Sequence, residues 1–460
     1  MNTLLLIVLW VCEITFMALA IAKKPEKKLW NQSRVMVAAG ETVLFLLLLL
    51  LPGIDLGFRF AMLFGLLVFR LIWSGLLALL LRKKANEKKK IPAILFHTVG
   101  SMILFAFSLF PSYLILDYKG LPVSGAYNVG MAQGILVDPD RTETFETDGS
   151  CREVPVYFYY PENAASGEKY PVVFFSHGAF GYYQSNSSTY MELASEGYVV
   201  VSVEHPYHSL FTKDTDGRTI IADVTFLNDV LRATDETDIT EQEIVELSSK
   251  WVELRTADLN FAIDTLKADA LSGELSAQWH TEKPEEIGTI LAMCDFEHLG
   301  LMGHSLGGAS SVELGRVRTD VDAVVNFDGT MLGEILGVAE DGVHDIIREE
   351  EYSVPILSFD NEVHHADRMS CMENGEPYAN NVLLDNATEG YATYIVGTEH
   401  MNYTDLPLIA PIPAKMLGTG SADPKACVEK MNEVTLSFFD HYLKDKGEFS
   451  VDECIELSES

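Results

Sequence analysis

The sequence predicts an all-α transmembrane bundle of four helices followed by an α/β domain with a doubly wound, mainly parallel sheet. Three observations predict this: long apolar runs near the N-terminus, a change of charge near residue 120, and short apolar segments that then alternate with helical patterns. Residues 1–120 hold 14 Lys+Arg and 6 Asp+Glu, a net charge of +8. The remainder of the 460 residues holds 19 Lys+Arg and 61 Asp+Glu, a net charge of −42. A strongly acidic domain repels polyanions, so nucleic acid is excluded as its partner.

Four apolar runs approach the roughly 20 residues that a helix needs to cross a bilayer. They are Leu4–Ala22, Val35–Ile54, Phe58–Leu81 and Ile91–Leu116, and we assign residues 1–120 to this transmembrane domain. The first run lacks a basic leader and a small-residue cleavage site, which favours a retained helix over a signal peptide.

The loops between the runs predict the orientation. The basic residues lie in the first and third loops: Lys23, Lys24, Lys27, Lys28, Arg34, Arg82, Lys83, Lys84, Lys88, Lys89 and Lys90. Because basic loops stay in the cytoplasm, we expect a multi-pass protein of the cell membrane with an extracytoplasmic C-terminal domain. Glu13, Glu41 and Arg70 lie within the runs and are expected to pair inside the bundle.

Residues 121–150, rich in turn formers at their start, are predicted to be a linker, and residues 151–460 form the α/β domain. The predicted strands are Val154–Tyr160, Pro171–Ser176, Tyr198–Val203, His298–Met302, Val321–Asn326, Val354–Phe359 and Tyr391–Val396. The predicted helices are Thr189–Glu196, Val252–Ala268, Leu306–Arg316 and Val428–Leu443. Strands that are apolar throughout are typical of a parallel sheet buried on both faces.

The segment Gly303-His304-Ser305-Leu306-Gly307 follows a predicted strand and begins a predicted helix. This is the context of a GxSxG nucleophile elbow, which predicts an α/β-hydrolase fold with Ser305 as the nucleophile. The flanking glycines matter because a Cβ at either position would collide with the neighbouring strand or helix.

A serine nucleophile needs a base and an orienting carboxylate, which follow it along the chain in the order Asp/Glu, then His. His400 comes directly after the last predicted strand and is the expected base. Asp328 and Asp360 each end a predicted strand, and either could orient His400. His364 and His365 precede the last strand and are interpreted as surface residues.

An oxyanion hole is expected from two backbone N–H groups. Leu306 follows the nucleophile, and Ala179 lies in the loop after the Pro171–Ser176 strand. His177, in the same loop, is expected to support the loop rather than carry a proton.

Six segments resemble the plasma-type platelet-activating factor acetylhydrolases in sequence and order. They are Phe174–Gly181, Val203–Ser209, Arg255–Leu266, Gly303–Gly308, Asn326–Gly329 and Thr398–Asp405. In that family the acid follows the strand immediately after the elbow, so the resemblance implies Asp328 as the acid. Asp360 remains the alternative because it too ends a strand. It also implies His400 as the base, Ala179 and Leu306 as oxyanion donors, and the release of short or oxidised acyl chains from phospholipids.

Residues 211–250 form an unusually long connection with both acidic and apolar residues. Two interpretations remain: a lid beside the acyl site, or a solvated insertion with its own small helix. Cys371 and Cys427 flank the C-terminal catalytic segment and are the expected disulfide pair in an oxidising compartment.

The sequence therefore predicts a membrane-anchored serine esterase that acts on short-acyl or phospholipid esters, needs no cofactor or metal, and leaves its oligomeric state open. The partners expected are a small-molecule ester or phospholipid and the membrane lipid itself. An envelope glycan deacetylase or acyl transferase with the same triad is the alternative, because only the acceptor differs. A non-catalytic membrane receptor or scaffold is the alternative from another class.

Overall fold

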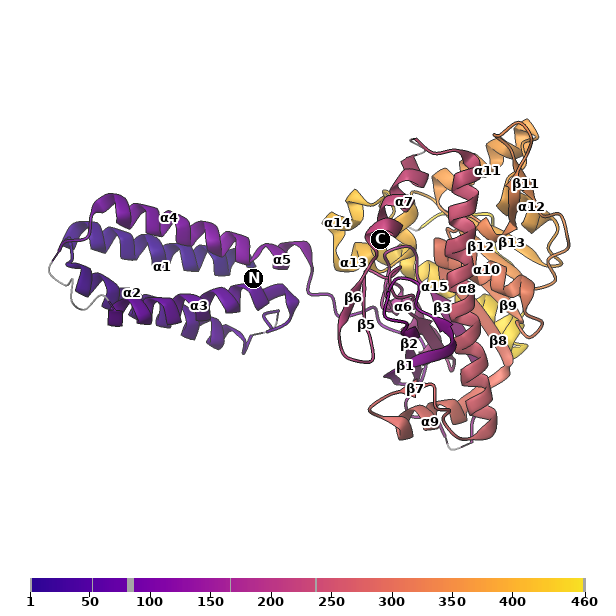
Figure 1. Cartoon of the computed structure of the whole chain (residues 1–460), viewed down its shortest axis with the longest axis horizontal. Coiled ribbons are helices and arrows are strands. Elements are labelled where there is room, and N and C mark those ends of the chain that lie inside the picture. The colour runs from indigo at the N-terminus through magenta and orange to yellow at the C-terminus, as the bar shows by residue number, and fades with distance from the viewer. Residues whose placement is uncertain (1, 52, 81–86, 166, 236–237, 458–460) are drawn as a thin grey trace. The chain divides into compact units, whose positions relative to one another are not determined.

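The computed structural model describes residues 2–51, 53–80, 87–165, 167–235 and 238–457. The chain folds into a mainly helical unit, which holds residues 1–119 and 409–413, and an α/β unit, which holds residues 120–408 and 414–460 (Figure 1). The helical unit contains α1 (Asn2–Lys23), α2 (Lys27–Leu48), α3 (Phe58–Leu80), α4 (Ile91–Ser108) and the short α5 (Phe110–Leu114).

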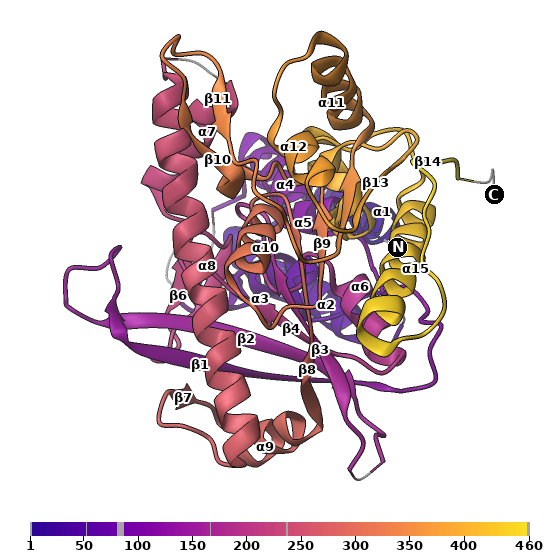
Figure 2. The same cartoon turned by 90° about the vertical axis from the view of Figure 1, so that its right-hand side faces the viewer.

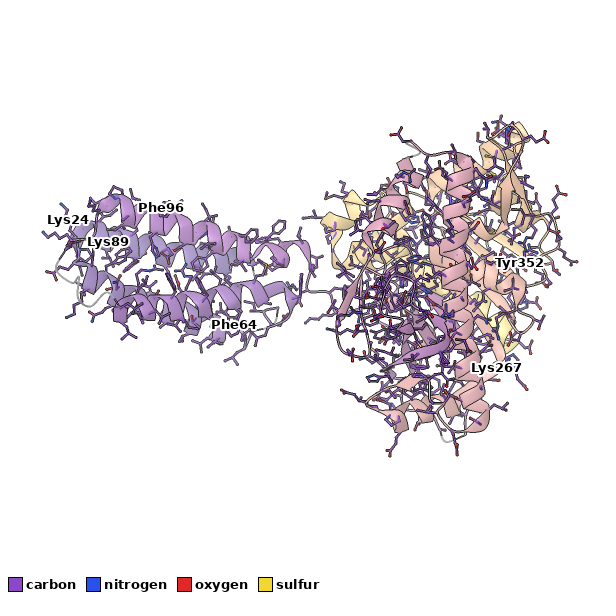
Figure 3. The ribbon with its side chains drawn as sticks, viewed as in Figure 1. Lys24, Phe64, Lys89, Phe96, Lys267 and Tyr352 are labelled. Atoms are coloured by element: carbon purple, nitrogen blue, oxygen red, sulfur yellow. The ribbon has the colours of Figure 1, made fainter. Side chains whose placement is uncertain are left out.

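Three of these helices, α1, α3 and α4, are long and apolar enough to cross a membrane. Their apolar side chains point outward: Phe96, for example, is 83% exposed, and it is seen at the surface of the helical unit in Figure 3. Such a surface indicates association with a membrane.

Two of the expected spans differ from the observed helices. The second was expected over residues 35–54, but α2 begins at Lys27, carries basic residues in its first turns, and ends at Leu48. The fourth was expected to reach Leu116, but α4 ends at Ser108 and α5 follows with Pro111 in its first turn. Proline has no N–H to continue a helix, which accounts for this end. Leu81 and the basic residues Arg82, Lys83 and Lys84 lie outside the described residues.

Charged side chains meet inside the helical unit. Glu13 is fully buried and accepts hydrogen bonds from Arg34 at 2.9 and 3.0 Å, and it also pairs with Arg70. Arg70 lies 3.1 Å from Glu41. The expected pairing of Glu13, Glu41 and Arg70 is present, but Arg34, which we assigned to a basic loop, completes the cluster from within α2. Two carboxylates and two guanidinium groups leave no net formal charge in the bundle interior.

The α/β unit is built on a ten-stranded sheet in the order β14-β13-β12-β9-β8-β3-β4-β2-β1-β7. Neighbours from β14 to β4 are parallel, and β2, β1 and β7 extend the sheet antiparallel. The strands of this sheet are β1 (Val129–Thr142), β2 (Cys151–Pro161), β3 (Tyr170–Ser176), β4 (Val199–Val203), β7 (Trp279–His280), β8 (Cys294–His304), β9 (Ala323–Phe327), β12 (Ile356–Asp360), β13 (Gly390–Ile395) and β14 (Cys454–Ile455). Two small hairpins stand apart: β5 (Phe211–Lys213) with β6 (Thr219–Ile221), and β10 (Ile335–Val338) with β11 (Asp345–Ile347).

Helices cover both faces of the sheet (Figures 1 and 2). The helices that follow β3 along the chain are α6 (Ser187–Ser195), α7 (Val224–Asp235), α8 (Glu241–Ser272), α9 (Pro284–Met293), α10 (Leu306–Val317), α11 (Glu362–Asn374), α12 (Ala379–Asp385), α13 (Leu406–Ile409), α14 (Pro411–Met416) and α15 (Pro424–Lys444). Among them, α8, α9 and α10 pack on one face of the sheet, and α6 and α15 pack on the other. Along β3, Val172 and Phe174 pack into the core under α8 and α9, whereas Val173 and Phe175 pack into the core under α6 and α15. A strand alternates its side chains between faces, so a strand covered on both sides must be apolar throughout.

The predicted strands and helices are all present, with shifted ends. The helix expected over Val252–Ala268 begins eleven residues earlier, at Glu241, where Thr240 and Glu243 form a reciprocal capping box. The expected linker 121–150 contributes β1, which pairs along most of its length with β2. The expected Cys371–Cys427 disulfide is absent, and both residues are free thiols.

Candidate active site

Ser305 lies between the end of β8 and the first residue of α10. Its φ of 55° and ψ of −126° give the sharp, strained turn of a nucleophile elbow. A Cβ at Gly303 would come within 2.3 Å of the Gly307 backbone, and a Cβ at Gly307 would come within 2.0 Å of the Ser176 carbonyl oxygen. Only glycine fits at these two positions, which explains the motif in physical terms.

Asp328 and His400 meet at the same edge of the sheet. Asp328 directly follows β9, and His400 begins a short 3₁₀ turn after β13. The His400 Nδ1–H donates to Asp328 Oδ2 at 2.6 Å. This bond leaves His400 Nε2 as the free nitrogen of the ring.

The alternative acid, Asp360, lies at the end of the next strand, β12, and is fully buried. Its carboxylate pairs with Arg368 of α11. Among the described residues no histidine bonds to this carboxylate, so the geometry favours Asp328.

Asp328 is also bonded to His364, so the expectation that His364 is a surface residue is wrong. His364 Nδ1 donates to Asp328 Oδ1 at 3.1 Å, and its Nε2 contacts the Tyr378 hydroxyl. The Asn361 backbone and side chain each donate to Asp328 at 2.7 Å. β9 and β12 are neighbours in the sheet, so the strand order alone would bring the start of α11 to Asp328. His365, by contrast, stacks on Tyr394 and lies 3.8 Å from Glu453.

These bonds keep Asp328 ionised. Burial would raise the pKa of the Asp328 carboxyl, but the hydrogen bonds from His364 and His400 hold it well below its usual value. Burial alone would lower the pKa of His364, yet the hydrogen bond and the charge of Asp328 raise it above the usual value of an imidazole. Burial and the neighbouring His400 lower the pKa of His304 to about 3, so His304 is neutral.

These residues line a cavity of about 430 Å³. Ser305, Asp328, His364 and His400 line it together with Ala179, Val230, Thr234, Trp251, Leu306, Thr330, Leu332, Asn361, Val363, Asp367 and Tyr378. Within the described part of the chain, the Ser305 hydroxyl has no hydrogen-bond partner. In hydrolases the contact between a nucleophile and its base is often long before a substrate binds.

The two expected oxyanion donors lie in this cavity, at the start of α10 and in the loop after β3. Neither the Ala179 N–H nor the Leu306 N–H bonds to an acceptor in the described ranges, so both are available to a ligand. In the loop, His177 is fully buried and holds the Gly178 carbonyl at 2.7 Å and the Ser209 hydroxyl at 2.9 Å. It supports the loop, as expected, rather than facing the cavity.

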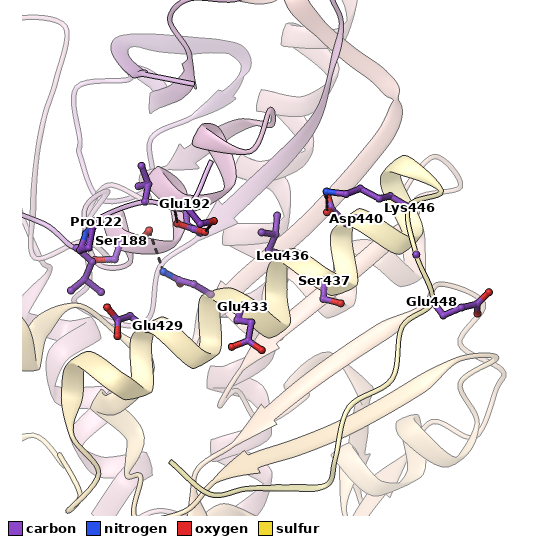
Figure 4. A pocket seen from close by; sticks show the side chains of 15 residues that line it. Pro122, Ser188, Glu192, Glu429, Glu433, Leu436, Ser437, Asp440, Lys446 and Glu448 are labelled. Atoms are coloured by element: carbon purple, nitrogen blue, oxygen red, sulfur yellow. Dashed lines mark hydrogen bonds and ion pairs between the residues drawn. The ribbon is translucent and has the colours of Figure 1, made fainter. Parts of the chain in front are cut away.

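A second, larger cavity of about 610 Å³ lies between α6 and α15 (Figure 4). Its lining includes Glu192, Glu429, Glu433, Asp440 and Glu448, and Asp440 is paired there with Lys446 at 2.5 Å. It contains neither Ser305 nor His400, so the smaller cavity is the candidate active site.

The fold and the site define an α/β-hydrolase with a serine at the nucleophile elbow. The sequence profile of "Platelet-activating factor acetylhydrolase, isoform II" matches residues 145–459, and the chain belongs to this family. The family predicted from sequence is therefore confirmed.

Individual relatives are distant. The platelet-activating factor acetylhydrolase of Gallus gallus is 22% identical over 62% of this chain and 64% of its own length. The platelet-activating factor acetylhydrolase of Canis lupus familiaris is 20% identical over 62% of this chain and 60% of its own length. The chain thus spans somewhat under two thirds of these relatives. A ferulic acid esterase from Streptomyces cinnamoneus, 19% identical, superposes with a TM-score of 0.51 over 72% of this chain and 95% of that chain. At this identity the likeness supports the fold.

Proposed function

We propose that this chain is a membrane-anchored serine hydrolase that cleaves carboxylic esters through Ser305, His400 and Asp328. The observation that carries the proposal is the 2.6 Å bond between His400 and Asp328 in the cavity that also holds Ser305. Family membership supports the same reaction class.

In this reaction Ser305 Oγ attacks the ester carbonyl carbon while His400 Nε2 takes the hydroxyl proton. The N–H groups of Ala179 and Leu306 bind the oxyanion, and Asp328 stabilises the imidazolium. Collapse of the tetrahedral intermediate releases the alcohol, which takes the proton from His400, and leaves an acyl-enzyme. A water molecule then attacks the acyl carbon while His400 Nε2 takes its proton. Collapse of this second tetrahedral intermediate breaks the bond to Ser305 Oγ, which takes the proton back from His400, and the acid is released.

We further propose short-acyl or phospholipid esters as substrates. The cavity presents apolar side chains, among them Val230, Trp251, Leu306 and Leu332, against which an acyl chain can pack. The membrane anchor would hold such a site close to lipid.

The proposed topology is multi-pass with the hydrolase domain outside the cytoplasm. The first loop and the described end of the third loop, residues 87–90, lie at one end of the helical unit, where Lys24 and Lys89 are seen together in Figure 3. Their backbones are joined by hydrogen bonds from Lys27 to Glu87 and from Lys89 to Pro25, at 2.8 and 3.0 Å. One end therefore collects basic residues, which supports its assignment to the cytoplasm.

Labelling of the full-length chain in detergent with a fluorophosphonate probe tests the enzymatic proposal. We expect labelling and hydrolysis of p-nitrophenyl acetate, both lost in Ser305→Ala. Ser249→Ala, at an exposed serine of α8, is the matched control and should behave like the unsubstituted chain. Absence of labelling in the folded chain, or labelling that survives Ser305→Ala, would refute the proposal.

A further inference from the structure

Arg255 of α8 is fully buried beneath the loop that carries Ala179. One of its guanidinium nitrogens donates to the His177 carbonyl oxygen, and the other terminal nitrogen donates to the Gly178 carbonyl oxygen at 3.3 Å. Its Nε donates to His208 Nδ1 at 3.4 Å. Within the described ranges Arg255 forms no ion pair. A buried cation that binds only neutral acceptors is costly for the fold, and burial lowers the pKa of Arg255 to about 9.

These bonds fix the orientation of one peptide group. The Gly178 carbonyl oxygen also accepts from the Gly181 N–H at 3.0 Å and from His177 Nδ1 at 2.7 Å. In a trans peptide the C=O of residue 178 and the N–H of residue 179 point in opposite directions. Anchoring the Gly178 carbonyl toward α8 therefore turns the Ala179 N–H away from α8.

The Ala179 end of this peptide lies at the active-site cavity. Ala179 lines the cavity together with Ser305 and Leu306. A Cβ built on Gly178 would lie 3.2 Å from the Ser305 Cβ, so the loop lies directly against the nucleophile.

We propose that Arg255 is a positioning residue for the oxyanion hole, because it holds the Gly178–Ala179 peptide with its N–H directed at the developing oxyanion. This inference rests on the proposed function. Arg255 itself touches no reacting atom. Without it, the Gly178 carbonyl would lose its charged donor, and the peptide could rotate and remove one of the two oxyanion donors.

Arg255→Met, which keeps the length of the side chain but removes every donor, tests the proposal in the full-length chain. We expect kcat for p-nitrophenyl acetate to fall by about 10²–10³, the range seen when one oxyanion donor is lost, with little change in KM. Rates are expressed per active site, titrated with the fluorophosphonate. A trifluoromethyl ketone, which forms a tetrahedral oxyanion adduct with the serine, should lose affinity in parallel with kcat. Arg255→Lys, which keeps one charged donor, should recover part of kcat and part of the affinity for the ketone.

The matched control is Arg152→Lys. Arg152 is also buried and is paired with Asp258 at 2.7 Å and Glu143 at 2.9 Å, but it contacts neither His177 nor Gly178. We expect it to lower stability while kcat per active site stays within about threefold.

Retention of kcat in Arg255→Met within threefold overturns the proposal, as does a fall of kcat with unchanged affinity for the ketone. If Arg255→Met does not fold, Arg255→Lys is judged by the same two measurements. An unsubstituted chain without Ser305-dependent turnover would refute the proposed function instead, so the two failures are distinguishable.

Discussion

Asp328 is the residue on which the other polar groups of the site converge. It receives hydrogen bonds from His400, His364 and Asn361 and lies buried at the carboxyl edge of the sheet. A carboxylate held by so many donors stays ionised and fixes the rings around it. Substitutions of single residues can distinguish Asp328 from Asp360 as the acid, and can distinguish the role of His364 from that of His365.

Asp328→Asn should reduce kcat by about 10⁴, because the amide no longer fixes the tautomer of His400 or stabilises its imidazolium. Asp360→Asn should lower the stability but change kcat per active site less than threefold, because Asp360 pairs with Arg368. Ester hydrolysis by both variants provides the comparison. A large loss of kcat in Asp360→Asn, with little loss in Asp328→Asn, would identify Asp360 as the acid.

His364→Phe should lower the free energy of unfolding by about 2 kcal/mol at pH 6, because Asp328 loses a charge-assisted hydrogen bond. The pKa of His364 is raised in the folded chain, so its contribution is fully present below the unfolded pKa of about 6.5 and is lost as pH rises through the folded pKa. The difference from the unsubstituted chain should therefore shrink toward pH 9 in thermal unfolding experiments. His365→Phe is the neighbouring control. An equal loss of unfolding free energy in His365→Phe would contradict the stabilising hydrogen bond between His364 and Asp328.

At the scale of elements, the segment between β4 and α8 divides into the β5–β6 hairpin and α7. Phe226 of α7 stacks on His208 at 3.8 Å between ring centroids and packs on Phe180 and Trp251. Val230, one turn later, lines the active-site cavity. This arrangement favours the lid interpretation of residues 211–250, and it connects α7 through His208 to Arg255 and the loop that carries Ala179.

Val230→Phe should shorten the acyl chain that the site accepts. Each buried methylene is worth about 0.8 kcal/mol, so excluding four of them costs about 3 kcal/mol, or roughly 100-fold in kcat/KM. We expect that loss for p-nitrophenyl hexanoate and less than a threefold change for the acetate. Leu231→Phe, at a position of α7 that is 52% exposed, is the control. Equal losses for both esters would show that α7 does not border the acyl site.

In the whole molecule, the two units differ in net charge and in the polarity of their surfaces. The helical unit is suited to contact with lipid, and the α/β unit is suited to contact with water. The helical unit buries charges and exposes apolar side chains, whereas the α/β unit buries two apolar cores, one on each face of its sheet. The basic loops support the proposal that the hydrolase domain lies outside the cytoplasm.

Cys454 offers a test of this topology, because it is an exposed free thiol in the α/β unit. In intact cells a membrane-impermeant maleimide should label the chain, and Cys454→Ser should remove most of the signal. Cys294 and Cys427 are buried and contribute little, whereas the partly exposed Cys151 and Cys371 account for the labelling that remains. Labelling of Cys454 that requires permeabilised cells would place the hydrolase domain in the cytoplasm.

The sequence by itself determined the family, the α/β class and the place of Ser305, because these depend on local patterns. Apolar strands, flanking glycines and a strand–turn–helix context are set within a few residues, and the three apolar helices are set by composition. Only the tertiary structure decided which distant side chains meet. Strand order brought His364 to Asp328, which no local pattern indicates. Burial placed Arg34 with Glu13, and it placed Arg255 under the loop that carries Ala179. The reason is physical: hydrogen bonds between residues far apart in the chain depend on how strands and helices pack, and a one-dimensional pattern does not contain that packing.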